Sequence, residues 1–158
     1  MARKKKEQES IAPWLYKGQE LKDIPENILA NQYGFVYLIT NKLDGYQYIG
    51  KKNLFKYKTQ VSRVLNERTG RMNKVKEVVK VGESDWRTYY GSSVEIKEAV
   101  QKDGKENFIR EILYFVPTKK QLTYFEAKEL FSRGVIEPGS KFYNSNILAK
   151  FYGSDFKG

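Results

Sequence analysis

The sequence contains neither cysteine nor histidine among its 158 residues. The absence of thiols excludes disulfide frameworks, thiolate nucleophiles, zinc fingers and iron–sulfur sites. The absence of imidazole excludes Ser-His and Cys-His catalysis, histidine-metal nucleases and histidine general bases. Any bound metal must therefore sit on oxygen ligands, which favours Mg²⁺, Mn²⁺ or Ca²⁺. Any proton transfer must use a carboxylate, a lysine or a tyrosine.

Long apolar segments are missing as well. No run of 18 apolar residues occurs, and residues 1–10 are charged throughout, so neither a membrane span nor a signal peptide is predicted. We expect a soluble, cytoplasmic protein that does not act in a membrane.

The charge is strongly of one sign. Lys and Arg number 29 against 19 Asp and Glu, which gives a formal net charge of +10 and a pI near 9.6. Such a chain is expected to bind polyanions, and nucleic acid comes before membrane among these. Apolar residues make up 40 % and aromatic residues 15 %, enough to bury the core of one domain at this length.

The chain divides into four predicted parts. Residues 1–10 form a basic tail, either solvated or supplying an auxiliary phosphate contact. Residues 11–31 mix prolines with large apolar residues and predict an arm packed on the domain. The core domain spans 32–148, and residues 149–158 form a C-terminal tail.

Regular structure is predicted to begin with a β-hairpin. A β-branched and aromatic run at 34–40, an Asp-Gly turn at 44–45 and a returning run at 46–50 are typical of this motif. A basic insert follows at about 53–83. Residues 51–80 hold ten Lys or Arg against two Glu, a local charge of +8, and their scattered valines predict a thin helical stripe.

Two capping boxes predict helices farther along the chain. Ser92 with Glu95 begins one helix, and Thr118 with Gln121 begins another that ends before Gly134. A largely apolar run at 108–116 between them has strand length. The order of elements predicts a small α+β domain in which helices flank a three-stranded antiparallel sheet.

Glu126 is the most informative carboxylate. It lies midway between Leu122 and Leu130, four residues from each, so it falls within the apolar stripe of its helix. An ionised side chain there is costly unless it is paired or bound to a metal. Two interpretations of Glu126 follow. It lies at the edge of the stripe, where its carboxylate reaches solvent or pairs with a lysine, or it serves as a metal ligand or as an acid with a shifted pKa.

Tyr37 and Tyr48 lie on the two strands of the predicted hairpin. Paired tyrosines of this kind form cross-strand aromatic contacts. In a chain without histidine they are also among the few groups able to orient or deprotonate water, and neighbouring lysines and arginines could lower the pKa of a tyrosine.

The segments Gly34-Phe35-Val36-Tyr37 and Tyr48-Ile49-Gly50, at hairpin spacing, resemble the two halves of the signature of the GIY-YIG nuclease superfamily. The resemblance extends to the SegE-like branch of phage homing endonucleases and covers residues 11 to 148. The segments that resemble this branch are 14–16, 48–52, 84–93 and 108–113.

This resemblance implies a metal-dependent endonuclease that hydrolyses DNA phosphodiester bonds. Glu126 would hold Mg²⁺, with Mn²⁺ as a substitute, and Tyr37 would orient or deprotonate the attacking water with Tyr48 beside it. Asn144 would position the site. The superfamily's phosphate-stabilising arginine has no clear counterpart, and the candidates for this role are Lys52, Arg63 and Arg87.

The basic stretch would lie along the backbone of double-stranded DNA and supply affinity with little sequence choice. The predicted contacts are Lys51, Lys56, Lys58, Arg68, Arg71, Lys74, Lys76 and Lys80. A non-catalytic DNA- or RNA-binding protein on the same scaffold is the main alternative, and Glu126 discriminates, since a pure binder has no reason to keep a carboxylate facing phosphate. A long homing site would require the insert, the N-terminal arm or a homodimer on DNA.

Overall fold

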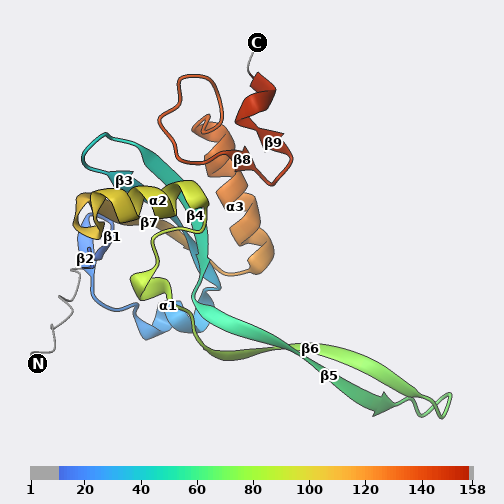
Figure 1. Ribbon diagram of the computed structural model, residues 1–158. Coiled ribbons are helices and arrows are strands. Elements are labelled where there is room, and N and C mark those ends of the chain that lie inside the picture. The colour runs from blue at the N-terminus through green and yellow to red at the C-terminus, as the bar shows by residue number, and fades with distance from the viewer. Residues whose placement is uncertain (1–10, 157–158) are drawn as a thin grey trace, which may run out of the picture.

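The computed structural model describes residues 11–156, so the predicted basic tail at 1–10 lies outside the described residues. A five-stranded sheet with the order β2-β1-β7-β3-β4 forms the centre of the fold (Figure 1). Its strands are β1 (Trp14–Tyr16), β2 (Gln19–Leu21), β3 (Gly34–Asn41), β4 (Gln47–Asn53) and β7 (Phe108–Val116).

The sheet confirms the predicted α+β class. Strand β3 is antiparallel to both of its neighbours, β7 and β4, and the three form the predicted three-stranded core. The predicted arm extends this core, because β1 pairs parallel to β7 and β2 pairs antiparallel to β1. A short helix, α1 (Glu26–Asn31), then leads into β3. The arm is therefore part of the sheet.

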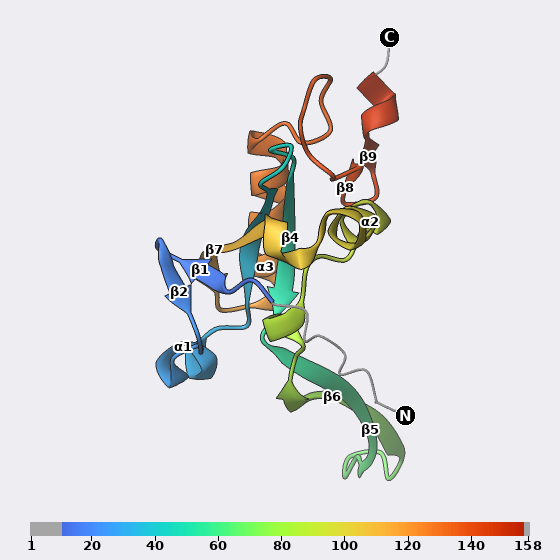
Figure 2. The same cartoon turned by 60° about the vertical axis from the view of Figure 1, so that its left-hand side comes forward.

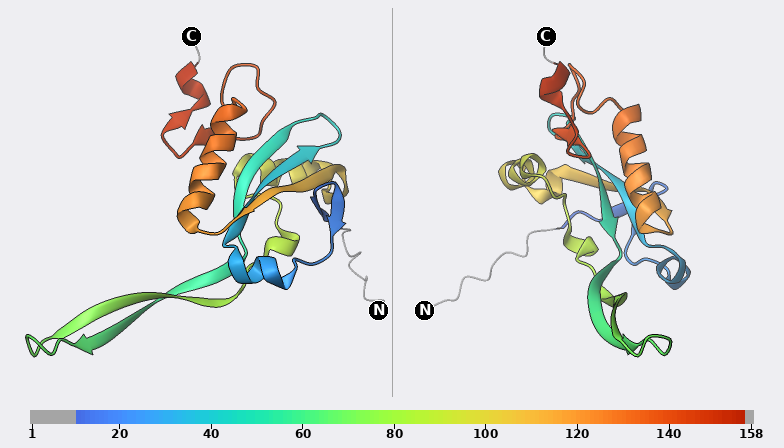
Figure 3. Two further views of the ribbon diagram at one scale, coloured as in Figure 1. Left: turned by 180° about the vertical axis from the view of Figure 1, so that it is seen from behind. Right: turned by 90° about the vertical axis from the view of Figure 1, so that its right-hand side faces the viewer.

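Helices cover both faces of the sheet. α2 (Val94–Asp103) lies on one side and α3 (Lys119–Ser132) on the other (Figure 3). Because side chains alternate along a strand, β3 supplies Phe35, Tyr37 and Ile39 to the core beneath α2, and Val36 and Leu38 to the core beneath α3. Burial on both faces explains why this strand is almost entirely apolar.

The helix boundaries follow from local chemistry. The Thr118 hydroxyl accepts a 3.1 Å hydrogen bond from the Gln121 backbone N–H, as predicted, and α3 ends before Gly134, whose φ of +58° favours glycine. The cap of α2 is Ser93, one residue beyond the predicted Ser92, and it accepts from the Ile96 N–H. Short 3₁₀ turns, η1 (Trp86–Thr88) and η2 (Lys105–Asn107), flank α2.

The basic insert forms a long β-hairpin, and the predicted helical stripe is wrong. β5 (Phe55–Leu65) pairs antiparallel with β6 (Met72–Glu83), and the hairpin projects away from the sheet (Figures 1 and 2). An amphipathic helix needs a surface on which to bury its stripe. The valines of the insert have none, since Val61, Val64 and Val78 are exposed, and β-branched residues favour the extended backbone.

The C-terminal segment packs beside α3. β8 (Asn146–Ile147) pairs with β9 (Phe151–Tyr152), and η3 (Gly153–Phe156) follows, so the predicted C-terminal tail contains regular structure as far as Phe156. Across residues 11–156, no helix combines the length and the apolar character needed to span a membrane.

Candidate active site at the outer edge of β4

The outer edge of β4 carries a polar pocket of about 380 Å³. β4 is the last strand of the sheet, so groups from both faces can meet across this edge. The α3 side contributes Glu126, and the loop before α2 contributes two serines. The polar lining residues are Tyr48, Lys51, Ser92, Ser93, Glu126, Asn144, Ser145 and Asn146.

The backbone groups of two residues on the outer edge of β4, Gln47 and Ile49, are hydrogen-bonded to the segment that follows α3. Gln47 N–H donates to the Lys141 carbonyl, and the Gln47 carbonyl accepts from the Tyr143 N–H. The Asn144 side chain then spans Ile49: its Oδ1 accepts from the Ile49 N–H at 3.0 Å, and its Nδ2 donates to the Ile49 carbonyl at 2.8 Å. The predicted positioning residue Asn144 thus ties the C-terminal segment to the strand that carries Tyr48.

The carboxyl group of Glu126, from α3, lies beside Lys51, the next residue of β4 whose backbone faces this edge. Burial raises the pKa of its carboxyl group, while the Lys51 ammonium and the Lys51 backbone amide act in the opposite direction. Within residues 11–156 no cation forms an ion pair with Glu126, because the Lys51 Nζ donates instead to the Thr123 Oγ1 at 2.9 Å. The carboxylate is therefore half-buried and open to a ligand in the pocket.

The donor set fits a Mg²⁺ ion held by one carboxylate. The described part of the chain has no cluster of three acidic side chains that could enclose a metal. Mg²⁺ commonly keeps several waters and binds through one or two carboxylates plus substrate phosphates. Glu126 supplies that carboxylate, and the pocket leaves room for the other ligands.

Tyr37 lies inside the core. Its side chain is fully buried, its hydroxyl has no hydrogen-bond partner, and it packs over Gly50, where a Cβ would approach the Tyr37 hydroxyl to 2.2 Å. Tyr89 is near enough to affect the Tyr37 pKa but does not meet hydrogen-bond geometry. Burial raises the pKa of Tyr37 well above its ordinary value. The expectation that nearby cations lower this pKa is wrong, because desolvation dominates.

Tyr48 reaches the pocket. Its ring lies 6.2 Å from the Tyr37 ring, which is the predicted cross-strand aromatic contact, and its hydroxyl hydrogen-bonds with Ser92 Oγ at 3.2 Å. Tyr48 lines the same pocket as Glu126, whereas Tyr37 does not. The two tyrosines are therefore neighbours with different surroundings.

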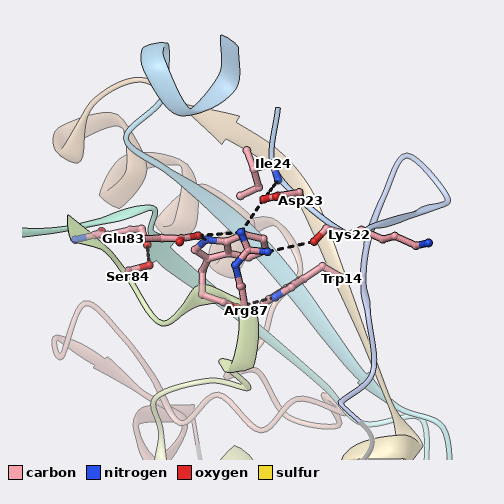
Figure 4. Close-up of polar contacts among 9 residues, drawn as sticks. Trp14, Lys22, Asp23, Ile24, Glu83, Ser84 and Arg87 are labelled. Atoms are coloured by element: carbon pink, nitrogen blue, oxygen red, sulfur yellow. Dashed lines mark hydrogen bonds and ion pairs between the residues drawn. The ribbon is translucent and has the colours of Figure 1, made fainter. Parts of the chain in front are cut away.

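Neither candidate arginine reaches the pocket. Arg87 turns toward the N-terminal arm, where its guanidinium binds Asp23 Oδ1 at 2.6 Å, Glu83 Oε1 at 3.3 Å and the Lys22 carbonyl at 3.2 Å (Figure 4). Arg63 lies on the exposed outer part of β5. The assignment of Arg63 or Arg87 to the scissile phosphate is thus not supported by their positions.

The two lysines after Tyr48 diverge because successive side chains on a strand point to opposite faces. Lys51, predicted only as a DNA contact, lines the pocket. Lys52 points to the other face, where its Nζ pairs with Asp85 at 2.5 Å and lies 3.9 Å from the centre of the Tyr89 ring. Strand alternation separates the two lysines, but only the packing of α3 shows that Glu126 lies on the side of Lys51.

Arg110 is a structural residue that the sequence analysis did not identify. It is 1 % exposed between the Trp14 and Tyr90 rings, and it donates to the carbonyls of Ala12, Arg87 and Tyr89. Burial lowers the pKa of Arg110 to about 10. This side chain holds the loop that leads to Ser92 against the N-terminal arm; the only sequence signal is an arginine within an apolar strand.

Comparison with known proteins gives one match. The family model described as "Putative endonuclease segE, GIY-YIG domain" matches residues 14–147. Comparison with curated proteins and with solved structures finds no match. The matched region contains the sheet, both large helices, the hairpin and every residue that lines the pocket except Leu148.

Proposed function

This chain belongs to the segE family of GIY-YIG endonuclease domains, and on that basis we propose that it hydrolyses phosphodiester bonds of double-stranded DNA in a metal-dependent reaction. The observation that carries the proposal is Glu126, a half-buried carboxylate without an ion-pair partner in the described chain, facing a polar pocket. A protein that only bound DNA would gain nothing from a negative charge there, because phosphate is itself anionic.

Glu126 would hold Mg²⁺ or Mn²⁺, and the bound ion would polarise the phosphate and stabilise the leaving oxygen. Lys51 supports Glu126 in the ionised state and adds positive charge beside the phosphate. Its ammonium stands where the candidate arginines do not reach, so we assign to Lys51 the stabilisation of the extra charge on the phosphate.

The water-handling role passes from Tyr37 to Tyr48. The Tyr48 hydroxyl lines the pocket and already exchanges a hydrogen bond with Ser92, so it can accept or donate one to the attacking water. Tyr37 supports the Tyr48 ring from within the core. Asn144 is a positioning residue that fixes β4 through both of its backbone hydrogen bonds.

The role in a phage homing pathway is a further part of the proposal. Homing requires recognition of a long target, and the projecting β5–β6 hairpin offers the additional surface. A homodimer on DNA would extend the contact in the same way.

Relaxation of a supercoiled plasmid tests the proposal. We expect cleavage with Mg²⁺ or Mn²⁺ and none in EDTA, and a loss of roughly 10²-fold or more for Glu126→Gln. Glu98→Gln, which changes an exposed glutamate on α2 away from the pocket, is the matched control and should cleave like the parent. Binding of duplex DNA in EDTA should be the same for all three proteins.

Two outcomes would contradict this function. Cleavage by Glu126→Gln within a few-fold of the parent would remove Glu126 from the reaction. DNA binding by the parent without cleavage in any divalent metal would instead identify a non-catalytic binding protein.

A further inference from the structure

The β5–β6 hairpin distributes its charges unequally between its two faces. Residues opposite one another in an antiparallel pair share a face, and successive residues alternate between faces. The register pairs Tyr57 with Lys80 and continues without interruption to Leu65 with Met72. The face of every side chain between these pairs is therefore determined.

One face is basic and the other is neutral. The basic face carries Arg63, Lys74, Lys76 and Lys80 and no acidic residue. The neutral face, over the same length, has one cation and one anion, Lys58 and Glu77. Lys58, which the sequence predicts to bind DNA together with Lys74 and Lys76, thus lies on the other face of the hairpin from them. Arg63, predicted for the scissile phosphate, lies on the same face as Lys74 and Lys76.

The basic face contains an unfavourable arrangement in the free protein. Arg63 and Lys74 are directly opposite one another, and like charges in such a cross-strand pair are destabilising. Within the described chain, none of the four cations of the basic face forms an ion pair. An external anion would relieve this repulsion, whereas the neutral face has no such requirement.

We infer that the basic face lies against the phosphate backbone of double-stranded DNA while the neutral face points away from it. This inference rests on the proposed function, which supplies DNA as the ligand. The 11 residues of β5 extend about 36 Å at 3.3 Å per residue, close to one turn of duplex DNA. The four cations lie between Lys80, opposite Tyr57, and the Arg63–Lys74 pair, a length of about 20 Å at 3.3 Å per residue, and this spread suits a regular polyanion better than a small anionic ligand.

The base of the hairpin connects the basic face with the catalytic pocket. Tyr57, on the basic face, stacks on Tyr33 with ring centres 5.1 Å apart. The Tyr33 hydroxyl accepts a hydrogen bond from Asn53, which shares a face of β4 with Lys51 because the two are two residues apart. A duplex whose phosphate occupies the pocket can therefore continue along the basic face as the hairpin projects (Figure 2).

A charge-transfer experiment tests the inference. The first variant, Lys74→Gln with Lys76→Gln, removes two cations from the basic face. The second adds Ser62→Lys and Val64→Lys to it, which restores the net charge on exposed neutral-face positions that do not face Glu77. Duplex binding is measured in EDTA at salt concentrations between about 50 and 200 mM, and circular dichroism confirms that each variant is folded.

We expect the first variant to lower the slope of log K against log salt by about 1.8, since each phosphate contact contributes roughly 0.9. This corresponds to about 60-fold weaker binding near 0.1 M salt. The second variant should remain equally weak, because its new lysines face away from the duplex. Lys58→Gln, the control on the neutral face, should bind like the parent.

Recovery of parental affinity by the second variant would overturn the inference, because net charge and not its placement would then determine binding. An unchanged salt slope in the first variant would also overturn the inference and would indicate that the basic face is exposed to solvent or contacts a second copy of the chain. Failure of the parent to cleave DNA, with the binding pattern retained, would contradict the proposed function alone.

Discussion

Replacement of each hairpin tyrosine by phenylalanine separates the two roles that the structure distinguishes. Tyr37→Phe removes a buried hydroxyl that has no hydrogen-bond partner. An unsatisfied group of this kind costs about 1–3 kcal/mol, and phenylalanine keeps the ring against Trp14 and Tyr48. After allowing for the packing lost with one oxygen atom, we expect Tyr37→Phe to be more stable than the parent by about 1 kcal/mol.

Tyr48→Phe should behave in the opposite way. Its hydroxyl exchanges a 3.2 Å hydrogen bond with Ser92 Oγ, so its loss should cost about 0.5–1 kcal/mol of folding stability. Because the same hydroxyl faces the pocket with Glu126, plasmid cleavage should fall by roughly 10²-fold or more, the scale of general acid–base catalysis. Tyr37→Phe should cleave within a few-fold of the parent.

Urea unfolding followed by tryptophan fluorescence measures the stabilities, since Trp14 and Trp86 are both buried in the core beneath α2. In a thermal scan, 1 kcal/mol corresponds to a shift of about 2–4 °C in Tm for a domain of this size. Destabilisation by Tyr37→Phe would refute the reasoning, because the hydroxyl would then have a partner. Loss of cleavage by a stable Tyr37→Phe would return the water-handling role to Tyr37.

Two further predictions concern the edge of β4. Burial raises the pKa of the Glu126 carboxyl group above its ordinary value of 4.5. The folded protein therefore keeps this proton to a higher pH than the unfolded chain does. As a result, the parent loses folding stability as the pH rises from about 4.5 to the pKa of the folded state. Glu126→Gln has no carboxyl group at this position, so its free energy of unfolding in EDTA should exceed that of the parent by an amount that grows over this pH range. A difference in urea unfolding that does not depend on pH would show that burial of Glu126 is not the cause. Asn144→Ala leaves the Ile49 N–H and carbonyl without their partner and should cost about 1–3 kcal/mol, with faster hydrogen exchange at the Ile49 amide; unchanged exchange would show that Asn144 does not hold the strand.

The hairpin, the start of α3 and the carboxylate that lines the pocket were accessible from the sequence because each depends on local chemistry. The Asp-Gly turn between two β-branched runs specifies β3 and β4, and Thr118 with Gln121 specifies the start of α3. Glu126 stood out because a charge within an apolar helical stripe conflicts with burial. The absence of histidine and cysteine restricted any metal to oxygen ligands before any geometry was known.

The insert shows where local reasoning failed. Valine spacing in residues 53–83 is compatible with a sparse helical stripe, yet nothing in the fold covers such a stripe. The pairing of β5 with β6, and with it the separation of Arg63, Lys74 and Lys76 from Lys58, depends on a register that only the folded hairpin defines.

By itself, the sequence determined the α+β class and the central hairpin and drew attention to Glu126, because turn chemistry, capping and apolar periodicity act over a few residues. Only the tertiary structure decided which tyrosine meets the pocket, which lysine stands beside Glu126, and why neither Arg63 nor Arg87 does. These outcomes depend on which groups from distant segments meet across the edge of β4, and on how deeply each hydroxyl or carboxylate is removed from water. Spacing along the chain carries no information about either.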